Sequence, residues 1–187
     1  MMVKRGTAVL MIMLLSAIGV RAQKLGVSVD FLELAQLGTL NLAADYAVGR
    51  HWSVTADARY NPFTFHNGDP ERQFQARQQS YSIGARLWPW HIMSGWWFAG
   101  KARWQEYNMG GILSQRTKEG DRFGAGLYTG YAYMLSSHLN LEFGLGVWAG
   151  ADIYKVYSCP QCGLTLDGGT KAFVLPDDIM ISLVYVF

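Results

Sequence analysis

Residues 178–187 read D-I-M-I-S-L-V-Y-V-F. The side chains of this stretch alternate between two faces, as the side chains of a β-strand do. One face carries Ile179, Ile181, Leu183, Tyr185 and Phe187, and the other carries Met180, Ser182, Val184 and Val186. A strand of about ten residues is long enough to cross an outer membrane when it is tilted. The stretch therefore predicts the closing strand of a membrane β-barrel.

The same alternation recurs along the chain and is broken by turn residues. It predicts seven further strands, at about 25–32, 39–48, 52–60, 81–87, 96–105, 123–133 and 139–148. Apart from a short link at 35–38, long and short connections alternate, and bacterial outer-membrane barrels have this asymmetry. We therefore predict an all-β fold, an eight-stranded antiparallel up-and-down transmembrane β-barrel with short periplasmic turns and longer extracellular loops.

The first 22 residues predict a secretory signal peptide, which leaves residues 23–187 for the barrel. Lys4 and Arg5 precede an apolar segment, and Val20 and Ala22 place small residues before a cleavage site. A retained anchor helix is the alternative. Cleavage takes Lys+Arg from 16 to 13 against 14 acids, so the net charge changes from +2 to −1. The mature chain has no basic stripe, and we expect no nucleic-acid partner.

Aromatic residues gather near both ends of the predicted strands, as the interfacial girdles of a membrane barrel do. The turn end carries Trp52, Trp88, Trp90, Trp96, Trp97, Tyr133 and Phe187, and the loop end carries Tyr60, Phe63, Trp104, Tyr107 and Phe123. A soluble barrel is the alternative, and its apolar face would point inwards. The two belts favour a barrel whose apolar face meets lipid.

The opposite face of the strands carries acids and bases in equal number. They are Asp30, Asp45, Asp57, Glu142, Arg59, Arg86, Lys101 and Arg103. We predict that they form a paired charge network in the lumen, although charges exposed to water would explain the same pattern. An eight-stranded barrel has room only for its own side chains, so we expect a filled interior.

Several motifs resemble those of a bacterial family of predicted outer-membrane β-barrels that carries only a domain-of-unknown-function label. They are H-W-S-V-T-A-D-A-R-Y-N-P-F at 51–63, Y-N-M-G-G-I at 107–112, the glycine- and tyrosine-rich run at 124–133, and K-V-Y-S-C-P-Q-C-G at 155–163. The resemblance implies an outer-membrane location, and it implies that some relatives are encoded among cell-surface or fimbrial genes. It implies no activity, substrate or catalytic residue.

Cys159 and Cys162 lie in the longest predicted loop. We expect a small disulfide between them, because the exported chain meets an oxidising compartment. A zinc half-site is an alternative, but it would need two further ligands, and the chain has no second C-x-x-C. A redox dithiol of the thioredoxin type would need a following helix, and here Gly163 and the pair Gly168-Gly169 follow.

The sequence assigns no catalytic, cofactor or metal residues. His66 has Asp69 and Glu71 nearby in sequence, and Ser80, Ser114 and Ser158 fall on the same predicted side, but no motif joins them. His51, His91 and His138 read as polar turn residues. The paired glycines 110–111 and 168–169 could cradle an anion, but turn geometry is the commoner reason for such pairs.

We therefore expect a protein of the cell outer membrane with a structural or surface-interaction role. Its expected partners are outer-membrane lipid, the barrel-assembly machinery through the C-terminal strand, and an extracellular protein or glycan. A lipid-modifying enzyme at the rim and a narrow channel are the alternatives.

Overall fold

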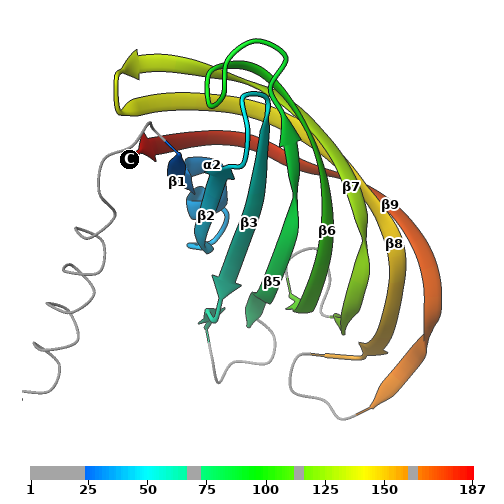
Figure 1. Cartoon of the computed structure of the whole chain (residues 1–187). Coiled ribbons are helices and arrows are strands. Elements are labelled where there is room, and N and C mark those ends of the chain that lie inside the picture. Colours follow the sequence, from blue (N-terminus) through cyan, green and yellow to red (C-terminus); the bar gives the residue numbers. More distant parts are fainter. Residues whose placement is uncertain (1–23, 67–72, 112–115, 160–163) are drawn as a thin grey trace, which may run out of the picture.

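The computed structural model describes residues 24–66, 73–111, 116–159 and 164–187, which form one antiparallel sheet (Figure 1). Its elements in chain order are β1 (Leu25–Asp30), α2 (Phe31–Ala35), β2 (Leu40–Ala47), β3 (Trp52–Asn61), β4 (Thr64–Phe65), β5 (Phe74–Leu87), β6 (Gly95–Gly110), β7 (Thr117–Ser136), β8 (Leu139–Tyr157) and β9 (Thr165–Val186).

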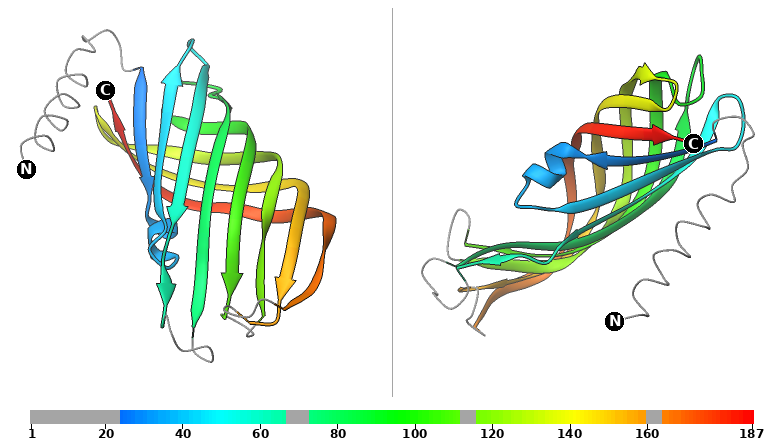
Figure 2. Two further views of the ribbon diagram at one scale, coloured as in Figure 1. Left: turned by 90° about the horizontal axis from the view of Figure 1, so that it is seen from below. Right: turned by 90° about the vertical axis from the view of Figure 1, so that its left-hand side faces the viewer.

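The sheet closes on itself, which confirms the predicted eight-stranded antiparallel barrel. Its order is β3-β2-β1-β9-β8-β7-β6-β5-β4, and β3 also pairs with β5, so that β4 is a two-residue addition at the rim. The first and last strands pair from Gly26 opposite Val186 to Asp30 opposite Ser182, as predicted from the C-terminal stretch. Lys24 N donates to Phe187 O at 3.2 Å, so the first described residue and the C-terminus meet at one end of the barrel (Figure 2).

The connections differ from the prediction at the end of the barrel away from the C-terminus, which we call the loop end. β6, β7, β8 and β9 run on through segments predicted as loops, so the β6–β7 connection is only 111–116 and the β8–β9 connection only 158–164. Gly168 and Gly169 lie within β9, paired with Lys155 and Tyr154, and not in a loop. Charged residues in these segments suggested loops, yet both faces of a strand can be polar where it leaves the apolar part of a sheet.

The link after the first strand also differs, because β1 ends at Asp30 and α2 begins at Phe31. The Asp30 carboxylate accepts from the N–H groups of Leu32 and Glu33 at 2.8 and 3.0 Å, which caps the helix. An acidic N-cap followed three residues later by glutamate favours a helix start. None of the helices among the described residues is long and apolar enough to cross a membrane.

The alternation of side chains sets the two surfaces of the barrel. Along β3, Trp52, Val54, Ala56, Ala58 and Tyr60 are turned outwards, and Ser53, Thr55 and Asp57 are buried inside. The aromatic rings in the lumen fit because glycines lie opposite them. A Cβ at Gly126 or Gly146 would overlap the ring of Tyr128, and a Cβ at Gly130 or Gly144 would overlap Trp97. Small and large residues therefore alternate around the inner wall.

Candidate functional site

The turn end of the lumen is filled by two tryptophans. Trp88 and Trp97 are both 0% exposed, and they pack with residues such as Met93, Val184 and Val186. Trp88 Nε1 donates to Ser53 Oγ at 3.0 Å. The prediction that these two tryptophans lie in the aromatic girdle on the outside of the barrel was therefore wrong. Trp88 continues the inner face of β5 after Arg86, so the alternation places its ring in the lumen.

Arg86 is at the centre of the next layer of the lumen. Its side chain is 1% exposed, with Nε 3.2 Å from Asp45 Oδ1 and Nη1 2.9 Å from Glu142 Oε2. The guanidinium also lies over the Trp97 ring at 4.4 Å. One buried cation thus joins β2, β5 and β8 across the barrel and is paired with two buried carboxylates.

Asp57 is at the centre of a second cluster. Lys101 Nζ lies 3.0 Å from Asp57 Oδ2, and Ser82 donates to the same oxygen. Arg59 Nε and Arg103 Nη2 lie 3.8 and 3.9 Å from Asp57 Oδ1. Here the cations outnumber the carboxylate, and part of the excess is balanced by Glu33 of α2, whose Oε1 lies 2.8 Å from Arg59 Nε.

Asp30 takes no part in these two clusters. One carboxylate oxygen caps α2, and the other accepts from Ser182 Oγ at 2.9 Å. The backbone N–H of Asp30 donates to Asn41 Oδ1 at 2.6 Å. The structure therefore divides the eight predicted lumen charges into two ion-pair clusters and one residue that joins β1, α2 and β9.

A third layer of charged residues lies nearer the loop end of the lumen. It was not predicted from the sequence, because its residues were assigned to loops or to the end of a strand. Asp152 is fully buried and accepts from Tyr107 Oη at 2.7 Å and from Lys118 Nζ at 2.5 Å, and Arg122 Nε lies at 3.5 Å. Tyr107 is 2% exposed inside the barrel, so its predicted place in the outer girdle was wrong. The Arg122 guanidinium lies over the Tyr107 ring at 4.0 Å.

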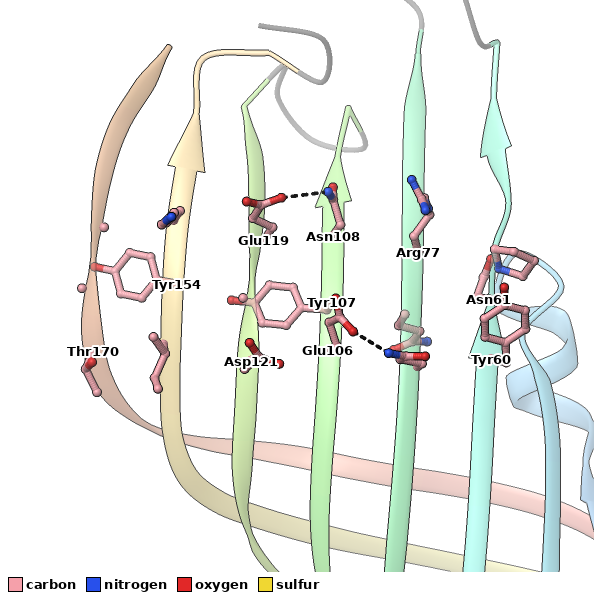
Figure 3. A pocket seen from close by; sticks show the side chains of 18 residues that line it. Tyr60, Asn61, Arg77, Glu106, Tyr107, Asn108, Glu119, Asp121, Tyr154 and Thr170 are labelled. Atoms are coloured by element: carbon pink, nitrogen blue, oxygen red, sulfur yellow. Dashed lines mark hydrogen bonds between the residues drawn. The ribbon is translucent and has the colours of Figure 1, made fainter. Parts of the chain in front are cut away.

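Above this layer the lumen opens into a cavity of about 700 Å³, which we call the mouth cavity (Figure 3). Its wall comes from β3, β5, β6, β7, β8 and β9. On each of these strands one inward position contributes, with the backbone on either side of it. These positions are Asn61, Gln78, Tyr107, Gly120, Tyr154 and Gly169. Amide and phenol groups predominate among these inward side chains, and the wall also includes charged residues, Arg77, Glu106, Glu119, Asp121 and Lys155, so the cavity offers hydrogen-bonding groups to a polar ligand.

Titratable groups at the loop end respond to neighbouring charges. Asp167 and Glu119 raise the pKa values of Tyr154 and Tyr157 respectively, since each carboxylate accepts a hydrogen bond from the phenol, at 3.4 and 2.6 Å. Burial lowers the pKa of Lys118, and the ion pair with Asp152 opposes that effect. Lys118 Nζ also lies 4.5 Å from the centre of the Tyr154 ring.

The outer surface has an uncharged belt, defined on β7 by Phe123, Leu127 and Tyr133 and continued on the other strands by residues such as Trp104 and Val174. Many of its side chains are widely exposed, for example Leu127 at 77% and Val174 at 71%. Among the described side chains, none that faces outwards within this belt is charged. Above the belt the outward residues become polar, and they include Arg77, Gln79, Glu106, Asn108, Glu119, Asp121 and Lys155.

The predicted girdle residues other than Trp88, Trp97 and Tyr107 are exposed. They are Trp52, Tyr60, Phe63, Trp90, Trp96, Trp104, Phe123, Tyr133 and Phe187. Tyr81 of β5 stacks on Trp104 at 6.0 Å between ring centres, and Trp96 meets the edge of Tyr131 at 5.5 Å. Aromatic pairs thus lie near both limits of the belt.

The structure does not bring the histidine and serine candidates together. His66 packs against the Phe74 ring, whereas Ser80 lies six residues further along β5 and is buried in the lumen. His51 is apart from these serines, and its Nδ1 lies 2.8 Å from the backbone oxygen of Trp88. Asp69, Glu71 and Ser114 lie outside the described residues.

The described part of the chain contains no group of three histidine, cysteine or carboxylate side chains that could hold a metal ion. Cys162 lies outside the described residues, so the disulfide with Cys159 stays a prediction. Residues 1–22 lie outside them too, and the signal peptide also stays a prediction.

Comparison with known protein families gives a match over most of the chain. The family model described as "Protein of unknown function (DUF3575)" matches residues 8–187. No curated protein and no solved structure matches the chain significantly.

Proposed function

Because the chain belongs to the DUF3575 family, whose description names no activity, we propose its function from the barrel itself: an integral outer-membrane protein with a structural or surface-interaction role. The observation that carries this proposal is the uncharged belt. From Phe123 to Tyr133 on β7 it spans roughly 33 Å along the strand, or about 25 Å of height at a tilt of about 40°. That height matches the apolar band of outer-membrane barrels.

A soluble location would leave this belt in water. Contiguous exposed apolar patches larger than a few hundred Å² are rare on soluble monomers, and this belt encircles the barrel through residues such as Leu42, Ile83, Leu127 and Leu145. The buried charges of Arg86 and Asp57 lie on the opposite face. Apolar groups outside and charged groups inside are the arrangement expected when lipid, and not water, surrounds the barrel.

The proposed orientation places the C-terminus and the tight turns in the periplasm and the polar strand extensions outside the cell. Support comes from the short turn at Ser137-His138 and from the charged outward residues above the belt at the other end. These extensions and their tips are the surface that a protein or glycan outside the cell would meet. A role in cell-surface or fimbrial assembly is the finer form of this proposal.

Cysteine labelling of intact cells tests location and orientation. In a background with Cys159→Ser and Cys162→Ser, Lys155→Cys should react with a membrane-impermeant maleimide in intact cells. His138→Cys should react only after the outer membrane is permeabilised. Recovery of the chain in the soluble periplasmic fraction, or the reverse labelling pattern, would contradict the proposal.

The interaction role needs a separate test. Replacing the β6–β7 and β8–β9 connections by tight turns should leave a folded barrel, because the lumen clusters of Arg86 and Asp57 remain. The shortened protein should reproduce the adhesion or surface-assembly defect of a strain that lacks the whole chain. A shortened barrel that restores the wild-type surface phenotype would argue for a purely structural role.

A further inference from the structure

The two edges of β9 differ greatly in their pairing. β8 pairs along β9 from Leu139 to Tyr157, whereas β1 pairs with the other edge only from Gly26 to Asp30. Within the described residues, no strand pairs with that second edge between Thr165 and Ile181. Figures 1 and 2 show β9 continuing well beyond β1, and above the closing pair this edge of β9 has no ladder partner among the described residues. We call this unpaired edge, with the side chains of β9 and β2 beside it, the slot.

Helix α2 lies at the closed end of the slot, in contact with both β9 and β2. It is held from inside, because Asp30 caps its N-terminus and its Glu33 pairs with Arg59 of β3 at 2.8 Å. Its Phe31 and Leu32 are exposed, at 47% and 39%. The helix thus turns a charged side to the lumen and an apolar side outwards.

A second, small cavity lies at this point. It is lined from β1, α2, β2 and β9 by residues that include Ser28, Glu33, Asn41 and Ser182, and it extends to Arg86 and Lys101. The closed end of the slot therefore borders the charged lumen, and the slot runs from there along β9 towards the level of the mouth cavity.

The height of the slot places it beside lipid if the belt lies in the membrane. Val174 and Ile179 of β9 and Leu40 and Leu42 of β2 are exposed apolar residues on its two sides. An unpaired backbone edge at this depth is tolerated only where it lines a water-filled cavity or is covered by protein. The slot is therefore a boundary between a hydrated lumen and an apolar exterior.

A partner strand fits this edge poorly. Pro176 has no N–H to donate to a ladder, and Gly168, Gly169 and Lys171 are residues that protect sheet edges against added strands. A ligand with one apolar and one polar part suits the boundary better. Resting on the proposed membrane location, we propose that the slot admits an acyl chain of an outer-leaflet lipid, whose polar head group lies in the mouth cavity.

The head group would meet hydrogen-bonding groups on the cavity wall and cations near it. Gln78, Tyr107 and Tyr154 line the wall, and Lys118 and Lys171 lie 4.5 and 5.2 Å from the centre of the Tyr154 ring. Lys171 precedes Ala172 at the upper limit of the belt, where the phosphate of an inserted phospholipid would lie. Carboxylates lie at the same level, since Asp152 pairs with Lys118 and Asp167 accepts from Tyr154, so a zwitterionic phospholipid head group matches this mixed charge.

Photo-crosslinking in vesicles tests the proposal. The full chain is reconstituted into vesicles of phosphatidylethanolamine and phosphatidylglycerol with labelled acyl chains, with p-benzoylphenylalanine at Phe173, which faces the lumen beside the slot and meets the Trp148 ring at 4.6 Å. Leu175, the next inward position on β9, provides a second probe. Outward Leu127 is the control inside the belt, and Tyr157, which is not part of the mouth cavity, is the control above it.

We expect lipid capture at Leu127 and at the two lumen-facing positions, and none at Tyr157. Capture at Leu127 without capture at Phe173 and Leu175 overturns the slot as a lipid site. Failure at Leu127 instead overturns the membrane location, so the two proposals fail separately. A crosslink from Phe173 to a polypeptide strand also overturns this proposal, in favour of edge pairing.

The helix offers a second measurement. Glu33→Gln removes the ion pair with Arg59 and should loosen α2, which raises lipid capture at Phe173 relative to Leu127 by roughly two- to five-fold, the factor expected for losing one partly exposed ion pair. Arg50→Gln, which removes a charge in the exposed β2–β3 turn away from α2 and the mouth cavity, is the control. Unchanged or reduced capture in Glu33→Gln overturns the role of α2 as a cover of the slot.

Discussion

Replacing Arg86 by methionine should destabilise the barrel strongly. Arg86→Met keeps a long side chain in the lumen but leaves Asp45 and Glu142 buried without their cation. Removing one partner of a buried ion pair costs about 3–5 kcal/mol, because the remaining charge has lost both water and its partner. The Trp97 ring also loses the guanidinium that lies over it at 4.4 Å.

Reversible urea unfolding from lipid vesicles or detergent micelles measures this cost. With a urea dependence of about 2 kcal/mol per molar, the unfolding midpoint should fall by about 2 M. Tryptophan fluorescence reports the transition, since Trp88 and Trp97 are buried in the same region. Loss of the heat-dependent shift of the folded barrel on a gel gives an independent readout.

Two further variants separate charge from packing. Arg77→Met removes an exposed outward arginine and should change the midpoint little. Adding Asp45→Asn and Glu142→Gln to Arg86→Met removes the stranded carboxylates and should recover most of the lost stability. If Arg86→Met shifts the midpoint no more than Arg77→Met does, the argument that this cation balances buried charge is refuted.

Three other changes give clear expectations. Leu127→Arg places a charge at the centre of the belt and should reduce the free energy of insertion by about 2–4 kcal/mol, measured by folding into vesicles. Deleting Phe187 removes the N–H that donates to Leu25 O at 2.8 Å and the ring against Tyr185, and it should lower the amount of barrel assembled in the outer membrane; normal assembly would count against the closing role of the terminal strand. The pKa of Tyr157 is raised because its phenol donates a hydrogen bond to Glu119. This hydrogen bond stabilises the strand extension at pH values below the usual tyrosine pKa and is lost as the pH rises through the elevated pKa. Glu119→Gln should return the pKa of the phenol, followed by ultraviolet absorbance, towards 10.0.

The alternation of apolar and polar residues was enough to predict the barrel, because each strand is exposed to different surroundings on its two faces. Trp52 to Tyr60 shows this most clearly, since Ser53, Thr55 and Asp57 are buried between exposed neighbours. The pairing of Gly26–Asp30 with Ser182–Val186 followed from the same pattern at the two ends of the chain. The same alternation predicts the burial of Trp88, because Trp88 shares the inner face with Arg86.

Other features could not be predicted from alternation. Phe31 continues the apolar pattern of the first strand, so α2 interrupts it without a change of pattern, and only Asp30 with Glu33 three residues later indicates a helix start. Lys118 and Asp152 were not joined in the sequence, because their pairing depends on strands that continue above the belt. The mouth cavity likewise depends on one residue from each of six strands, and their relative heights follow from strand register.

The pairing of β1 with β9 has a consequence for the time course of folding. Val27 meets Tyr185 and Asp30 meets Ser182, so the contacts that close the barrel join residues near the two ends of the described chain. Long-range contacts of this kind slow folding, because a large chain entropy is lost before they form. The remaining strands join neighbours along the chain and can assemble as successive hairpins. Closure should therefore be the last event, and until then the growing sheet keeps two free edges.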